Sequence, residues 1–144
     1  MFDPSQQDVR KFFCATYRKS VARAPLTAIE TIASDWIARH PEYHDLLADE
    51  AGATQSRFDA ADGRGNPFLH LSMHLAIAEQ LSIDQPPGIR AAWQQLAATS
   101  GDEHAASHEV MECLGEVLWQ SQRSGMPPDG DAYIECLRRR SGTR

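Results

Sequence analysis

The chain has 144 residues, of which 42% are hydrophobic and 24% are charged, a balance typical of a soluble globular domain. Lys and Arg total 14 and Asp and Glu total 20, so the net charge of −6 disfavours binding to nucleic-acid phosphates. No apolar run approaches the roughly 20 residues that span a bilayer, and the first residues lack a signal-peptide pattern. We therefore expect one domain, residues 1–144, in the cytoplasm and without a membrane segment.

The cysteine pattern supports the same expectation. Cys14, Cys113 and Cys136 are odd in number and far apart, and no C-x-x-C pair is present. Such spacing argues against a disulfide framework. The sequence therefore predicts three buried, reduced thiols in a reducing compartment.

The first part of the chain predicts three helices followed by a loop. An Asp-Pro pair, a common helix start, precedes an amphipathic pattern within residues 3–20. The next pattern, over 27–40, opens with a Thr-x-x-Glu capping box and ends before a proline, which begins a short third helix over 41–47. A polar stretch follows, and we expect a flexible loop at about 49–66.

The rest of the chain predicts four helices separated by turns that contain proline or glycine. An Asn-Pro pair begins a helix over 67–83 that is apolar on nearly every side, as in the centre of a bundle. Helical patterns with capping residues follow over 89–100, 103–124 and 130–140. No segment alternates like a strand. The predicted fold is therefore all-α, a single-domain helical bundle of about six to seven helices.

The six histidines form three pairs with H-x-x-x-H spacing. Random placement would give only about 0.2 such pairs in a chain of this length. Residues four apart lie on one face of a helix, so that a single ion can contact both imidazoles. The pairs are His40 with His44, His70 with His74, and His104 with His108.

Two of these pairs carry the metal-binding hypothesis. Glu112 continues the helical ridge formed by His104 and His108. His70 and His74 lie on an otherwise apolar helix face, where imidazoles need polar partners. We predict that these five side chains ligate a divalent transition metal, with zinc and iron as the leading candidates.

Four further residues receive supporting roles. Pro41 disfavours helical geometry at His40, so His40 and His44 are expected to cap a helix or hydrogen-bond. Glu79 and Glu116 are polar positions on otherwise buried helices, where they would orient the ligands. The pattern does not distinguish a catalytic ion from a structural one, so it specifies no enzyme reaction.

Two other interpretations stay open. In the first, the histidines are hydrogen-bonded core residues of a non-enzymatic interaction or structural protein. A protein partner would then contact the loop after Asp49 or a basic face of the first helix. In the second, the segment Gly63–Pro67 binds an anion or a nucleotide at a helix start. The basic residues of the first helix are Arg10, Lys11, Arg18, Lys19 and Arg23.

Several segments form a longer pattern that extends over most of the chain. They include Asn66-Pro-Phe-Leu-His-Leu-x-Met-His-Leu-Ala-Ile-x-Glu-Gln80, His40-Pro-Glu-Tyr-His44, Met111-Glu112-x-Leu-Gly-Glu116 and Gly125-x-Pro-Pro-Asp129. Together they resemble a bacterial family known as domain of unknown function 1841. The resemblance implies a small helical bacterial protein and carries no particular activity, substrate or cofactor.

Overall fold

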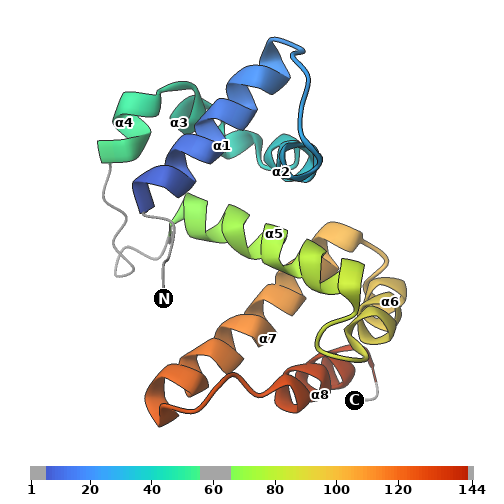
Figure 1. Cartoon of the computed structure of the whole chain (residues 1–144). Coiled ribbons are helices and arrows are strands. Elements are labelled where there is room, and N and C mark those ends of the chain that lie inside the picture. Colours follow the sequence, from blue (N-terminus) through green and yellow to red (C-terminus); the bar gives the residue numbers. More distant parts are fainter. Residues whose placement is uncertain (1–5, 56–65, 143–144) are drawn as a thin grey trace. The chain divides into compact units, whose positions relative to one another are not determined.

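The structure is a computed structural model that describes residues 6–55 and 66–142. These residues form eight α-helices and one 3₁₀ turn, with no strand among them, which confirms the all-α prediction (Figure 1). The chain divides into two compact units, residues 1–75 and 76–144, and the division falls inside one helix. The prediction of a single domain stays a prediction.

The first unit surrounds helix α1, which contacts α2, α3 and α4 (Figure 1). Its interior is a cluster of buried apolar residues to which α5 adds Phe68 and Leu71. The elements are α1 (Gln6–Val21), α2 (Ala28–Ala38), η1 (Pro41–Tyr43), α3 (His44–Ala48), α4 (Glu50–Gln55) and the first half of α5 (Pro67–Ile83).

The predicted signals at both ends of α2 are confirmed. The Thr27 hydroxyl accepts a hydrogen bond from the Glu30 amide at 3.2 Å, and the Glu30 carboxylate accepts one from the Thr27 amide at 2.9 Å. At the other end, His40 leaves the helical conformation with φ −127° and ψ 65° because proline follows it. Pro41 then begins η1, and the predicted short third helix forms as η1 followed by α3.

Helix α4 occupies Glu50–Gln55, where we expected the start of a flexible loop. The Asp49 carboxylate accepts a hydrogen bond from the Gly52 amide at 3.1 Å, and the Ala53 side chain is fully buried. The Arg10 guanidinium reaches across from α1 and donates to the Ala53 carbonyl at 2.9 Å. Long-range contacts therefore stabilise a segment whose local pattern is polar. Residues 56–65 of the predicted loop, which include the first three residues of the segment Gly63–Pro67, lie outside the described residues, as does the Asp-Pro start before α1.

The basic face predicted on α1 is partly used inside the molecule. Arg10 is only 6% exposed, and the Lys19 ammonium lies 2.8 Å from the Glu30 carboxylate. Arg18 is paired with Glu50 on α4 at 3.6 Å. Three of the five basic residues thus pair within the first unit, and contact of this face with a partner stays a prediction.

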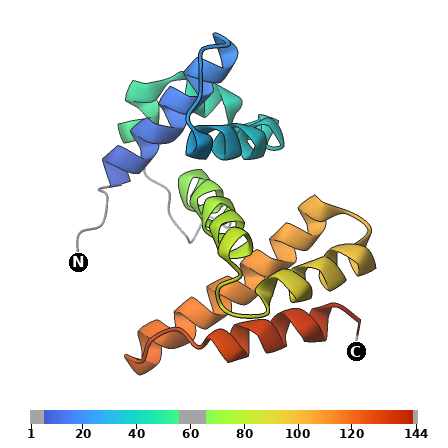
Figure 2. The same ribbon diagram turned by 45° about the vertical axis from the view of Figure 1, so that its right-hand side comes forward.

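The second unit consists of the last half of α5 and three further helices, each of which contacts the other two (Figure 2). The predicted caps are confirmed: the Asp102 carboxylate accepts from the His104 amide, and the Asp129 carboxylate accepts from the Ala132 amide, both at 3.1 Å. The three helices are α6 (Ile89–Ser100), α7 (Glu103–Ser124) and α8 (Gly130–Arg140).

The cysteine prediction was wrong for two residues. Cys113 on α7 and Cys136 on α8 form a disulfide, with their Cα atoms 5.9 Å apart. They are 23 residues apart in sequence, and only the approach of α7 to α8 brings them together. Cys14 is a buried free thiol as expected, and burial raises its pKa. The cysteines therefore no longer indicate a reducing compartment.

The expectation about membranes was tested on the described helices. None of them combines the length and the apolar character that crossing a membrane requires.

Candidate metal centre

Three imidazoles from two parts of the first unit come together at their Nε2 atoms. His40 follows α2, whereas His70 and His74 lie one turn apart on α5. The Nε2 atom of His70 is 3.1 Å from that of His40 and 3.2 Å from that of His74. His40 and His74 are only 2% and 1% exposed, and His70 is half-buried. We call these three residues the histidine trio.

The hydrogen bond on the far side of His40 fixes its tautomer. Its Nδ1 atom lies 2.7 Å from the Trp36 carbonyl oxygen, which can only accept, so Nδ1 carries the proton. In the neutral ring, Nε2 then presents a lone pair toward His70. A backbone carbonyl that binds the second ring nitrogen in this way is the usual support of a metal-ligating histidine.

The spacing of the trio matches the geometry of a small transition-metal site. Zinc holds imidazole nitrogens at about 2.0–2.1 Å with tetrahedral angles, which places two ligand nitrogens about 3.3 Å apart. The two Nε2 separations, 3.1 and 3.2 Å, are close to this value. Both nitrogen pairs that include His70 therefore have the separation that a single tetrahedral ion requires.

Aromatic rings hold two members of the trio in place. The Trp36 ring stacks on His74 with centroids 3.8 Å apart and an interplanar angle of 12°. The Tyr43 ring is parallel to the His40 ring, with centroids 5.3 Å apart. The guanidinium carbon of Arg39 lies 4.8 Å from the centroid of the Trp36 ring. Tyr43 is partly buried, and this burial is the main cause of its raised pKa. These contacts restrict the rotation of the imidazoles, as a ligand shell requires.

His44 does not join the trio, although it is four residues from His40. Its Nε2 atom lies 2.9 Å from the Ile37 carbonyl, and its ring packs at 5.0 Å from Tyr17. This agrees with the hydrogen-bonding role expected for His44. His40 also makes the expected hydrogen bond, from its Nδ1 to the Trp36 carbonyl. The turn at Pro41 in addition directs its Nε2 toward His70 on α5, a contact that the local pattern does not indicate.

In the second unit, the predicted ligands have different surroundings. The rings of His104 and His108 lie 4.5 Å apart, and a nitrogen of one is within 4.8 Å of a nitrogen of the other. Both are half-buried. The Glu112 carboxylate accepts a hydrogen bond from Arg140, and 65% of the Glu112 side chain is exposed. Ligation by these three residues stays a prediction.

The two carboxylates expected to orient ligands are both exposed. Glu79 lies on α5 and Glu116 lies on α7. Gln80, the residue after Glu79, has a structural role, since its side-chain oxygen accepts a hydrogen bond from the Tyr133 hydroxyl at 2.8 Å. Burial raises the pKa of Tyr133, so this phenol remains a donor. The supporting roles of Glu79 and Glu116 stay predictions.

Comparison with known proteins places the chain in a family. No curated protein and no solved structure matches it. The family model described as "Domain of unknown function (DUF1841)" matches residues 5–139, nearly the whole chain and a range that contains all six histidines. The chain therefore belongs to the DUF1841 family.

Proposed function

We propose that this protein binds a divalent transition-metal ion, zinc or iron in the first place, through His40, His70 and His74. The observation that carries the proposal is the convergence of three Nε2 atoms, with separations of 3.1 and 3.2 Å, in a largely buried setting. Imidazole ligands without thiolate suit zinc, iron, nickel and copper, whereas magnesium and calcium prefer oxygen ligands.

Proton sharing among the imidazoles accounts for this arrangement less well. The Nε2 atom of His70 contacts two other ring nitrogens. It carries at most one hydrogen, so it can donate a full hydrogen bond to only one of them. A cation would instead accept a lone pair from each ring. Because buried polar groups are costly unless they are satisfied, an ion would also stabilise the folded first unit.

A site with three protein ligands has defined chemical capacity. Tetrahedral zinc with three ligands from the protein keeps a fourth position for water or a substrate, which is the pattern of catalytic sites. An ion held in this way acts as a Lewis acid toward an oxygen bound in that position. Once the ion is bound, hydrolytic and redox reactions are the ones to screen.

The test is the metal content of the protein produced without a histidine tag. After treatment with chelator, the chain is incubated with zinc or ferrous ion, desalted, and analysed by plasma mass spectrometry. We expect about one ion per chain, and less than about a tenth of an ion in each of His40→Ala, His70→Ala and His74→Ala. His44→Ala is the matched control and should retain the ion. Retention in His74→Ala, or equal loss in His44→Ala, would contradict the proposal.

A further variant tests the ligands predicted on α7. If His104→Ala combined with His108→Ala also releases the ion, these residues belong to the same ligand set. If that variant alone releases it, the trio is the wrong assignment. The interpretation as hydrogen-bonded structural histidines predicts that no ion binds and that zinc leaves the melting temperature unchanged.

A further inference from the structure

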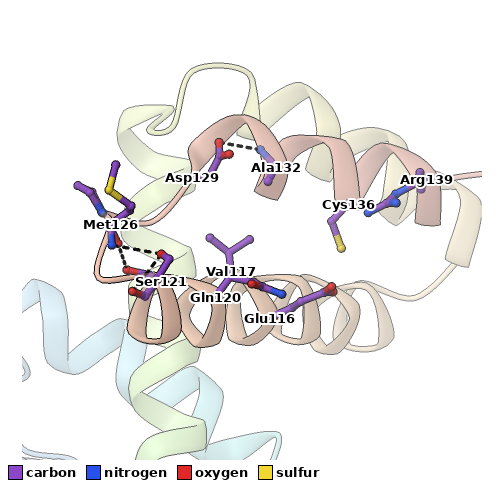
Figure 3. A pocket seen from close by; sticks show the side chains of 11 residues that line it. Glu116, Val117, Gln120, Ser121, Met126, Asp129, Ala132, Cys136 and Arg139 are labelled. Carbon is purple, nitrogen blue, oxygen red and sulfur yellow. Dashed lines mark hydrogen bonds between the residues drawn. The ribbon is translucent and has the colours of Figure 1, made fainter.

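A cavity of about 600 Å³ lies along α7 and α8 in the second unit (Figure 3). Its inner wall contains the buried side chains of Val117 and Cys136, which Figure 3 shows directed into the space between the two helices. Glu116 and Arg139 lie at the same end of the cavity as Cys136. Hydrogen bonds at the opposite end, from Ser121 to the Met126 carbonyl and at the Asp129 cap, fix the α7–α8 turn.

The cavity reaches one half of the disulfide. Cys113 has no exposed surface, whereas Cys136 is 6% exposed and lines the cavity. The rate of thiol–disulfide exchange depends on which sulfur an incoming thiolate can reach. Of the two cysteines, Cys136 lines the cavity and Cys113 does not, so a thiolate that enters the cavity meets Cys136 first.

We propose that this cavity is a thiol-exchange site, in which a low-molecular-weight thiol reacts with the disulfide at Cys136. The thiolate sulfur of the incoming molecule forms a bond to Sγ of Cys136, and the bond between Cys136 and Cys113 breaks. Cys113 leaves as a thiolate and takes a proton from solvent. One disulfide is exchanged for another, so that the electrons balance and no further oxidant is required.

The charged residues of the cavity indicate the class of thiol. Arg139 is three residues after Cys136, on the same side of α8, and its guanidinium suits a carboxylate. Glu116 faces the cavity from α7 and suits an ammonium group. A small thiol peptide with both a carboxylate and an amine, such as glutathione, fits these two charges, whereas an uncharged thiol would use neither.

The remaining cysteine provides an internal control. Cys14 is 1% exposed, and it lies on α1 among the core residues of the first unit. Burial raises its pKa, which lowers its thiolate fraction at neutral pH. It should therefore stay unmodified in the folded chain.

The first experiment uses the oxidised full-length chain. It is incubated with reduced glutathione under native conditions, released thiols are trapped with iodoacetamide, and the peptides are identified by mass spectrometry. We expect glutathione on Cys136 at least about tenfold more often than on Cys113, and none on Cys14. Equal labelling of Cys113 and Cys136, or labelling only after denaturant is added, would overturn the proposal.

Three variants sharpen this result. Cys113→Ser leaves the Cys136 thiol in the cavity and should react with oxidised glutathione at least about tenfold faster than Cys136→Ser, which leaves the shielded Cys113. Arg139→Gln should slow the reaction with glutathione about fivefold, the effect of one exposed ion pair, and leave that with 2-mercaptoethanol unchanged. An equal effect on both reagents would contradict the assigned class of thiol.

Discussion

The two units differ in what they bury. Among the described residues of the first unit, five polar or charged side chains are buried with the apolar ones: Arg10, Thr16, Glu30, His40 and His74. In the described part of the second unit, the buried polar side chains are two serines, and a disulfide joins its last two helices. The first unit therefore depends on pairing buried polar groups, and we expect acid to destabilise it by protonating Glu30. The second depends on apolar packing and one covalent bond, which makes it sensitive to reductants.

Spacing along one helix does not identify the third member of the histidine trio. His70 and His74 lie one turn apart on α5. His40 lies outside that helix, and its Nε2 atom is 3.1 Å from that of His70. His40 is 30 positions away from His70 in sequence, so the helical period of α5 does not indicate it.

The largest effect should follow from removing the disulfide. Closing a loop between cysteines 23 residues apart stabilises a chain by about 3 kcal/mol, chiefly through the unfolded state. We expect Cys113→Ser with Cys136→Ser to speed amide hydrogen exchange in α7 and α8 accordingly. Exchange in α1 and α2 is the control. An equal acceleration in those helices would break the comparison between the units.

A smaller effect is expected from Arg10, which holds α4 to α1. Arg10→Met keeps the length of the side chain but removes the donor to the Ala53 carbonyl, and an unsatisfied buried acceptor costs about 2 kcal/mol. Urea unfolding measures this loss. Arg18→Met is the matched control, because its pairing with Glu50 is exposed and is worth at most about 1 kcal/mol. Similar losses of unfolding free energy in both variants would show that the buried Arg10 hydrogen bond stabilises the fold no more than the exposed Arg18 ion pair does.

The smallest effect should come from the cap of α2. Thr27→Ala removes the hydroxyl that accepts from the Glu30 amide and should lower the free energy of unfolding by about 1 kcal/mol. Thr31→Ala, four residues later on the exposed side of the helix, should change it by less than about 0.5 kcal/mol. Thermal unfolding of both variants measures these losses. A larger loss in Thr31→Ala than in Thr27→Ala would contradict the stabilising role of the cap.

The pH dependence of the same cap sharpens the comparison. The Lys19 ammonium, followed by the Thr27 amide, lowers the pKa of Glu30 in the folded chain. Its carboxylate therefore stabilises the fold above the unfolded pKa, and this contribution is lost as the pH falls through the lower, folded pKa. We expect Glu30→Gln to be less stable than the parent at pH 7 and equally stable in strong acid. A difference that does not change with pH would contradict the ion pair.

Most helices could be predicted because their signals are local. The Thr27–Glu30 box, the Asn66-Pro67 start and the aspartates before α7 and α8 act within one turn, and the corresponding helices begin where these residues predict. Helix α4 was missed because its support is non-local. Arg10 on α1 donates to the Ala53 carbonyl and is 43 residues away from it in sequence. The local pattern around Ala53 therefore cannot indicate this contact.

The candidate site was predicted in part for the same reason. Spacing along α5 identified His70 and His74, since helical geometry places both on one face. His40 was ranked below them because the proline after it disfavours a helix, although that turn is what brings its ring to His70. The Cys113–Cys136 bond depends on how two helices pack and has no local signal. The packing of the helices and turns, rather than residue type, determines both the contact of His40 with His70 and the disulfide.

The hydrogen bond from His40 Nδ1 to the Trp36 carbonyl affects how selective the trio would be. A ligand whose rotamer and tautomer are set before the ion arrives loses little conformational entropy on binding. The His40 ring cannot turn away from His70 without breaking that bond, so the trio would favour ions with bonds near 2 Å to nitrogen. A larger ion such as calcium would be discriminated against twice, by the size of the site and by its preference for oxygen.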